Sequence, residues 1–75
     1  MSNMVRLTDI TFPDHRQAET TAELAGLVVS GWLAADGHTG SSPNVDALVR
    51  ALHRGDWVVV HKIADRLSLS VEALS

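Results

Sequence analysis

Residues 18–35 read AETTAELAGLVVSGWLAA, and this stretch decides the fold that we expect. Small residues recur in it at every fourth position, namely Ala18, Ala22, Gly26, Ser30 and Ala34. Positions i and i+4 lie on one face of an α-helix, so these residues would form a ridge with almost no side-chain height. The pattern predicts a helix against which a second helix packs closely, either from the same chain or from another copy.

The same stretch is apolar on nearly every side, which is typical of a central helix that is buried on two faces. Pro13 suits the first turn of a helix, whereas Thr20 and Glu23 match a capping box that would start the helix near residue 21. Asp36 and Gly37 form a good C-terminal stop. We therefore expect a central apolar helix over about 14–35, within a segment that spans residues 13–36.

The segment before this helix, residues 4–12, reads MVRLTDITF and is rich in strand-forming residues. A lone strand is not stable without a partner. The segment is therefore an extended arm on the helices, an edge strand that pairs with another chain, or a loosely ordered terminus. We adopt an extended N-terminal arm over residues 1–12 and leave its strand character open.

The second half of the chain predicts a helical hairpin over residues 43–75, after a loop at 37–42. Ser42 and Pro43 begin an amphipathic helix over about 43–54. The next segment, WVVVHKIADRLS at 57–68, contains three consecutive valines that favour a strand over 57–62, but a stripe of apolar residues at helical spacing favours a helix. Residues 71–75 would add one last helical turn at most. The expected fold is thus all-α, one domain of three helices over residues 1–75.

Length and composition exclude several classes of protein. A chain of 75 residues buries a marginal core, a problem that small proteins often solve by oligomerisation. The absence of cysteine excludes disulfides, thiol catalysis and cysteine-ligated metals. The longest uncharged apolar stretch, 24–35, would span about 18 Å as a helix, well short of the roughly 30 Å of a bilayer core. We expect a cytoplasmic protein without membrane contact.

No pattern of residues indicates catalysis. The four histidines, at positions 15, 38, 53 and 61, show neither HxH nor HxxxH spacing, so we predict no metal site. The nucleophile elbow GxSxG and the phosphate loops GxGxxG and GxxxxGK[ST] are absent. We expect no enzyme activity and no cofactor. A hydrolase with a histidine-bound metal is a third hypothesis, which treatment with a chelator would test.

Residues 63–74, IADRLSLSVEAL, resemble the first helix and turn of helix-turn-helix DNA-binding units. In these units the helix after the turn enters the major groove. Here that helix would begin near Ser70 and would hold Glu72 but no base-reading Arg, Lys, Asn or Gln. The resemblance implies a small DNA-binding regulator that uses residues 43–75. The net charge of −3 argues mildly against nucleic acid as a partner.

Residues 51–57, ALHRGDW, and 63–67, IADRL, resemble the turn and second helix of a tetratricopeptide-type repeat. Residues 42–75 have about the length of one repeat, but single repeats are not stable alone. Val60 also stands where such repeats usually carry a small residue. The resemblance supports a helical hairpin without assigning the family.

From these patterns we predict a small non-catalytic protein-interaction module, such as an adaptor, inhibitor or assembly factor, that acts by helix packing. The residues expected to mediate self-association are Ala18, Ala22, Gly26, Ser30, Trp32 and Ala34. Those expected to contact a partner or phosphate are Arg50, Arg54, Trp57, Lys62 and Arg66. A homodimer is favoured over packing within one chain, and Gly26→Leu should abolish it.

The alternative function is that of a small DNA-binding transcriptional regulator. Such a regulator should carry a basic face and bind DNA in a salt-dependent way. An interaction module should instead expose an apolar patch at Trp32, Trp57 or the N-terminal arm.

Overall fold

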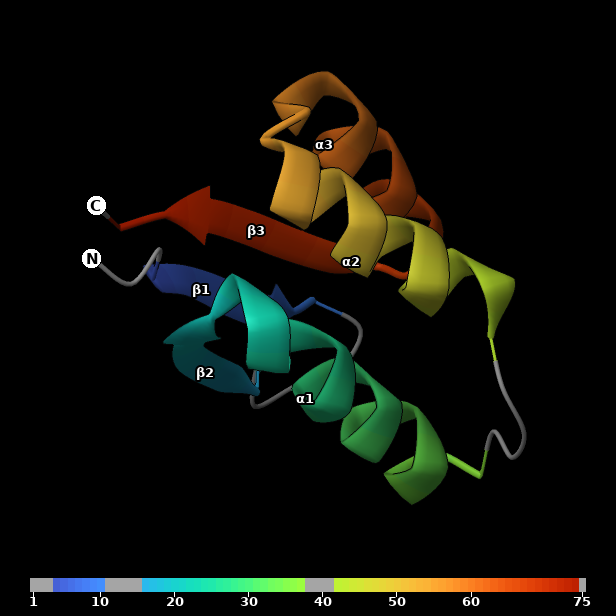
Figure 1. Ribbon diagram of the computed structural model, residues 1–75. Coiled ribbons are helices and arrows are strands. Elements are labelled where there is room, and N and C mark those ends of the chain that lie inside the picture. Colours follow the sequence, from blue (N-terminus) through green and yellow to red (C-terminus); the bar gives the residue numbers. More distant parts are fainter. Residues whose placement is uncertain (1–3, 11–15, 38–41, 75) are drawn as a thin grey trace.

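Three helices and a three-stranded sheet make up the protein in the computed structural model, which describes residues 4–10, 16–37 and 42–74. The elements follow the order β1 (Met4–Asp9), β2 (Gln17–Thr21), α1 (Ala22–Ala35), α2 (Pro43–Arg54), α3 (Trp57–Arg66) and β3 (Leu69–Ala73). The strands are antiparallel in the order β2-β1-β3, and the helices cover one face of this sheet (Figure 1). The expectation of an all-α fold is therefore wrong, because the segments around the helices form a mixed α/β structure.

The N-terminal segment is the central strand of the sheet and not an arm. Leu7 of β1 lies between Ala18 of β2 and Val71 of β3, so β1 has both its neighbours within the chain. Val5 and Leu7 point into the core, while Arg6 and Thr8 lie on the opposite face. Period-two alternation was thus a correct signal of a strand. The idea of an edge strand that pairs with another chain is wrong.

The open face of the sheet, on the side away from the helices, is polar. Arg6 lies in the middle of it, and its guanidinium is 3.0 Å from the carboxylate of Glu19 on β2 and 3.7 Å from that of Glu72 on β3. Beside this group, the amide of Gln17 donates to the hydroxyl of Thr8. These cross-strand pairs suit a face in contact with water.

The central helix begins later than the small-residue pattern predicts. Residues 17–21 form β2, so Ala18 belongs to the sheet and not to the ridge. α1 starts at Ala22, where Thr21 is the N-cap and its hydroxyl accepts a hydrogen bond from the amide of Leu24 at 3.3 Å. The capping box of Thr20 and Glu23 therefore placed the start within one residue, but the cap is Thr21 and the expected start at about 14 is wrong. Pro13, the alternative start, lies outside the described residues.

The last expected helical turn is also a strand. Ser68 adopts a left-handed conformation with φ 57°, which turns the chain out of α3 and into β3. Leu69 and Val71 are buried and pair with Asp9 and Leu7 of β1. The second helix that a helix-turn-helix unit needs is therefore not formed by residues 69–73.

The helical hairpin of α2 and α3 confirms the prediction for this region. α2 covers the expected 43–54, and α3 covers 57–66, two residues less than expected at its C-terminus. Gly55, with φ 69°, ends α2, and the carboxylate of Asp56 caps α3 by accepting from the amide of Val59 at 3.4 Å. The valines at 58–60 are helical, which resolves the alternative of a strand at 57–62. Residues 38–41 of the expected loop lie outside the described residues.

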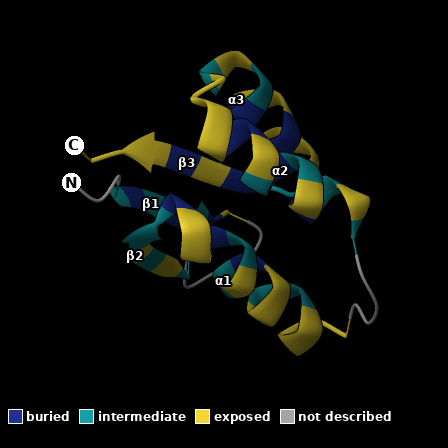
Figure 2. Cartoon of the chain, viewed as in Figure 1, coloured by how far each residue is buried: buried dark blue, intermediate teal, exposed yellow. Residues whose placement is uncertain are grey.

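The core lies between the sheet and the three helices (Figure 2). Leu7 from the sheet, Val29 from α1, Leu48 from α2 and Val60 from α3 are its largest fully buried side chains. The three helices, β1 and β3 therefore all contribute buried side chains to one core, whereas β2 contributes none. None of the described helices is long and apolar enough to cross a membrane.

Candidate functional site

The exposed face of α1 carries almost no charge. We call this face the α1 surface, and its seven exposed residues are Glu23, Leu24, Leu27, Ser30, Gly31, Ala34 and Ala35. Only Glu23 among them is ionisable. Leu24 is 50% exposed and Leu27 is 72% exposed, so two neighbouring leucines lie in water on a helix that is otherwise covered with small residues. A contiguous exposed apolar area of this kind marks an interaction site more often than single exposed apolar residues do.

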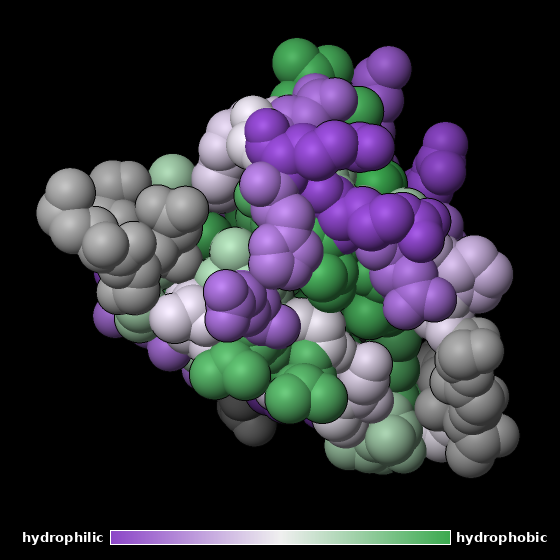
Figure 3. Space-filling view, in the orientation of Figure 1, coloured by the Kyte–Doolittle hydropathy of each residue, from purple (hydrophilic) through white to green (hydrophobic). Residues whose placement is uncertain are grey.

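The other two helices differ sharply from α1 in what they expose. The exposed positions of α2 carry Asp46, Arg50, His53 and Arg54, and those of α3 carry His61, Lys62, Asp65 and Arg66 besides Val58. The space-filling view shows hydrophilic side chains over α2 and α3 and hydrophobic ones beside α1 (Figure 3). The weak polarity is therefore a property of α1 and not of the whole surface.

A groove of about 410 Å³ continues the α1 surface onto α2. At this groove Gly26 lets α1 and α2 approach closely. A Cβ atom at this position would lie 2.7 Å from Cγ2 of Val49. Val45 and Val49 of α2 line it between the helices. One residue of the predicted small-residue ridge, Gly26, thus packs closely against a helix of the same chain.

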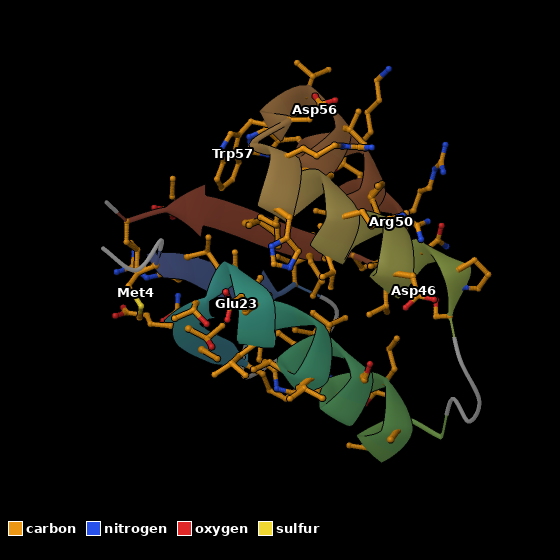
Figure 4. The ribbon with its side chains drawn as sticks, in the orientation of Figure 1. Met4, Glu23, Asp46, Arg50, Asp56 and Trp57 are labelled. Carbon is orange, nitrogen blue, oxygen red and sulfur yellow. The ribbon has the colours of Figure 1, made fainter. Side chains whose placement is uncertain are left out.

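Charges of both signs border this groove. Glu23 of α1, and Asp46 and Arg50 of α2, contribute to its lining (Figure 4). Within the described part of the chain, the ion pairs involve Arg6 and Arg16 and none of these three residues. The groove thus combines an apolar centre with charged groups that are available to a second molecule.

The structure does not bring the six residues expected for self-association together. Ala18 lies in β2, Ala22 is buried in the core, and Gly26 faces α2. Ser30 and Ala34 belong to the α1 surface, whereas Trp32 lies half-buried on another side of the helix. Sequence reasoning missed Leu24, Leu27 and Gly31. The signal that could have found them is the presence of leucines on the side of the helix opposite to Ala25 and Val29.

An Arg16 cluster, which sequence reasoning also missed, explains the position of Trp32. The guanidinium of Arg16 donates to the carboxylate of Asp9 and, at 2.9 Å, to that of Asp36. The same group lies 5.5 Å from the centre of the Trp32 ring, a cation–π distance. Asp9 is only 4% exposed, so this cluster joins the end of β1 to the end of α1 and is structural.

The hydrogen bond to Asp9 is the main reason that the pKa of Arg16 is raised above its ordinary value. The bond to Asp36 acts in the same direction, and desolvation opposes both. Because the pKa is raised, the contribution of the Arg16 charge to the stability of the folded state is present below its ordinary pKa and is lost only above it, as long as the two carboxylates are ionised.

The cations expected to contact a partner or phosphate lie on one hairpin but do not form a purely basic surface. Arg50, Arg54, Lys62 and Arg66 are all exposed on α2 and α3. The same hairpin exposes Asp46, Asp56 and Asp65, which offset most of the positive charge.

We therefore expect the protein to pass through a column of immobilised double-stranded DNA without retention at about 0.15 M salt. Strand β3 lies where the resemblance to a helix-turn-helix unit placed a recognition helix. The measurement is elution position against salt concentration. Retention that falls with salt and is lost in an Arg50→Gln, Arg54→Gln variant would instead support the DNA-binding alternative.

The structure describes two of the four histidines, His53 and His61. His53 and His61 are both exposed, and no group of three His, Cys, Asp or Glu side chains in the described ranges is arranged to hold a metal ion. The ring of His61 lies 5.7 Å from that of Trp57, which is half-buried at the start of α3. His15 and His38 lie outside the described residues.

The comparisons with known proteins identify a family. No curated protein and no solved structure matches the chain significantly. The model of the Rv2628 protein family matches residues 2–72, which include all of the elements described above except the last residue of β3. A match over nearly the whole chain cannot arise from one shared motif. The chain therefore belongs to the Rv2628 protein family.

Proposed function

We propose that this protein is a small non-catalytic protein-interaction module and that it acts by packing its α1 surface against another helix. The observation that carries the proposal is the exposure of Leu24 and Leu27 on a helix face with one charged residue. Burial of each leucine against a partner would contribute about 1–2 kcal/mol, because each is now at least half in water. The small residues Ser30, Gly31 and Ala34 allow a second helix to come close.

The partner that fits this surface best is a second copy of the chain. The α1 surface is nearly neutral, so two copies do not repel one another across it. In a two-fold dimer each patch contacts itself, and Arg50 of one protomer can then face Glu23 or Asp46 of its partner. A Cβ atom at Gly31 would have no neighbour within 4 Å, which leaves this part of α1 open to a second chain.

The first experiment is a measurement of mass by light scattering behind size exclusion, over about a hundredfold range of concentration. The proposal expects a species of twice 8.1 kDa that dissociates on dilution. A protein that stays monomeric over the whole range would contradict the homodimer.

The variant Leu27→Glu should convert the dimer to a monomer. A carboxylate at this position would be buried without a partner next to Glu23 and Asp46, so we expect the dissociation constant to rise about 30- to 100-fold. The measurement is the concentration dependence of mass.

The matched control for this variant is Val58→Glu. Val58 is 68% exposed, close to the 72% of Leu27, but it lies on α3 away from the α1 surface. The control variant should therefore dimerise like the parent protein. A Leu27→Glu protein that remains dimeric, or an equal loss in both variants, would show that α1 is not the interface.

A further inference from the structure

A second hollow lies at the end of the molecule where β1 begins and β3 ends. It has a volume of about 270 Å³ and is more enclosed than the groove between α1 and α2. The buried side chains of Val5, Ala22 and Leu52 contribute to its lining from three different elements. We call it the Trp57 pocket, because the half-buried indole of Trp57 is its largest lining side chain.

The start of β1 and the end of β3, which meet at this end of the sheet, contribute to the remaining walls. Met4 of β1 and Ala73 of β3 line the pocket together with Trp57 of α3. The side-chain view shows Met4 and Trp57 at the same end of the molecule, near the tip of β3 (Figure 4). The lining is therefore mixed, with apolar side chains next to polar groups in a partly open hollow, and a small-molecule site needs both kinds of group.

The polar groups of this pocket are cationic or neutral, and none is acidic. His53 and Arg54, in the last turn of α2, line it, and the described lining residues include no carboxylate. Arg54 takes part in no ion pair within the described part of the chain. The nearby carboxylate of Asp56 is directed to the amide of Val59, which it caps. The pocket therefore combines apolar walls with an uncompensated guanidinium.

From this arrangement we propose that the Trp57 pocket binds a medium-chain aliphatic carboxylate. The aliphatic chain lies against Leu52, Val5 and the indole of Trp57, where it is removed from water. The carboxylate lies at the pocket entrance and accepts hydrogen bonds from Arg54, a planar donor whose geometry matches it. The volume of about 270 Å³ is just under the roughly 300 Å³ at which sites for drug-sized ligands begin, so a medium-length chain fits better than a long one.

This site is separate from the α1 surface. The only α1 residue that lines it is the buried Ala22, and Leu27 lies in the other groove. Experiments can therefore contradict the proposed ligand site without contradicting the proposed dimer, and the reverse also holds.

The probe is octanoate, and the reporter is the fluorescence of Trp57 in a Trp32→Phe background, which leaves Trp57 as the single tryptophan. Octanoate should produce a saturable change in emission. Octanol has the same chain without the charge and should bind about fivefold more weakly, because it makes no charge-assisted hydrogen bond. Absence of a saturable change, or equal affinity for the two probes, would overturn the proposal.

Three variants locate the binding. Arg54→Gln should weaken octanoate about fivefold and leave octanol unchanged, whereas Arg66→Gln, an exposed cation of the same hairpin outside the pocket, should change neither. Ala73→Leu adds bulk to the wall at an exposed position and should abolish binding of both probes. Equal effects of Arg54→Gln and Arg66→Gln would overturn the proposal. The Leu27→Glu protein should bind octanoate normally whether or not it dimerises.

Discussion

The Gly26→Leu variant should lose about 2–3 kcal/mol of unfolding free energy, which corresponds to a fall in Tm of roughly 10–20 °C for a domain of this size. The first added carbon would lie 2.7 Å from Cγ2 of Val49, and the remaining atoms of leucine would extend further towards α2. Val49 is β-branched and cannot rotate its methyl group away at low cost. The variant must therefore push α1 and α2 apart. Thermal and urea unfolding would measure the loss.

The matched control is Gly31→Leu in the same helix. A Cβ atom at Gly31 meets nothing within 4 Å, so the change creates no clash. Because glycine is a poor helix former, this variant should gain up to about 1 kcal/mol when unfolding is measured at a concentration too low for the proposed dimer, whose surface includes Gly31. Equal losses in the two variants would contradict the close approach at Gly26. The neighbour of Gly26 is Val49 of α2 in the same chain, so Gly26→Leu tests packing within the chain.

The Asp9→Ala variant should be the second strongly destabilised protein, with a loss of about 2–4 kcal/mol. Asp9 is 4% exposed and ends the central strand, where its carboxylate accepts from the guanidinium of Arg16. The substitution removes the buried carboxylate of this pair, while the pair of Arg16 with Asp36 remains. The end of β1 then loses its ion-pair connection to the end of α1. Urea unfolding followed by circular dichroism would measure the effect.

The matched control for Asp9→Ala is Glu19→Ala, because Glu19 is also a carboxylate in the sheet that pairs with an arginine. Its partner is Arg6, and both side chains are substantially exposed on the open face. Exposed pairs contribute little, so we expect a loss below about 1 kcal/mol. High salt should reduce the effect of Glu19→Ala further, while the effect of Asp9→Ala should persist, because salt screens buried pairs less. Similar losses in both variants would show that Asp9 is not effectively buried.

The helical hairpin could be predicted from the sequence because its signals are local. Val45, Leu48 and Leu52 recur at helical spacing, and Gly55 and Asp56 mark the turn between α2 and α3. Such contacts join residues within one or two turns, and a single stretch of sequence contains all of them.

The sheet could not be predicted in the same way, because each strand depends on a distant one. Ala18 and Ala22 continue the four-residue period of α1, although Ala18 pairs with Leu7 across the sheet. β3 has five residues, too few for a period to be distinguished from a helical turn. In β1, the alternation is partly hidden because Asp9, a charged residue, occupies a buried position that Arg16 neutralises. Tertiary pairing thus overrode the local patterns.

The candidate site was predictable only in part. The apolar character of α1 indicated an interface, and this is a property of the sequence. Which side of α1 faces water depends on where the sheet and α2 cover it. The sequence alone therefore could not distinguish the exposed Leu27 from the buried Val29. The Trp57 pocket joins side chains from both ends of the chain, such as Met4 and Ala73, and no local pattern marks it.

The pairing of β1 with β3 also determines the order of events as the polypeptide acquires its structure. Leu7 meets Val71 across the sheet, so nearly the whole chain forms a loop that must close before this pair exists. Loop closure on this scale is entropically unfavourable and slows folding, whereas the hairpin of α2 and α3 needs only neighbouring residues. During synthesis, the hairpin can therefore form while the apolar side of β1 is still without its second neighbour. The sheet is completed only when the segment after α3 has left the ribosome, and until then β1 is the part of the chain most exposed to aggregation.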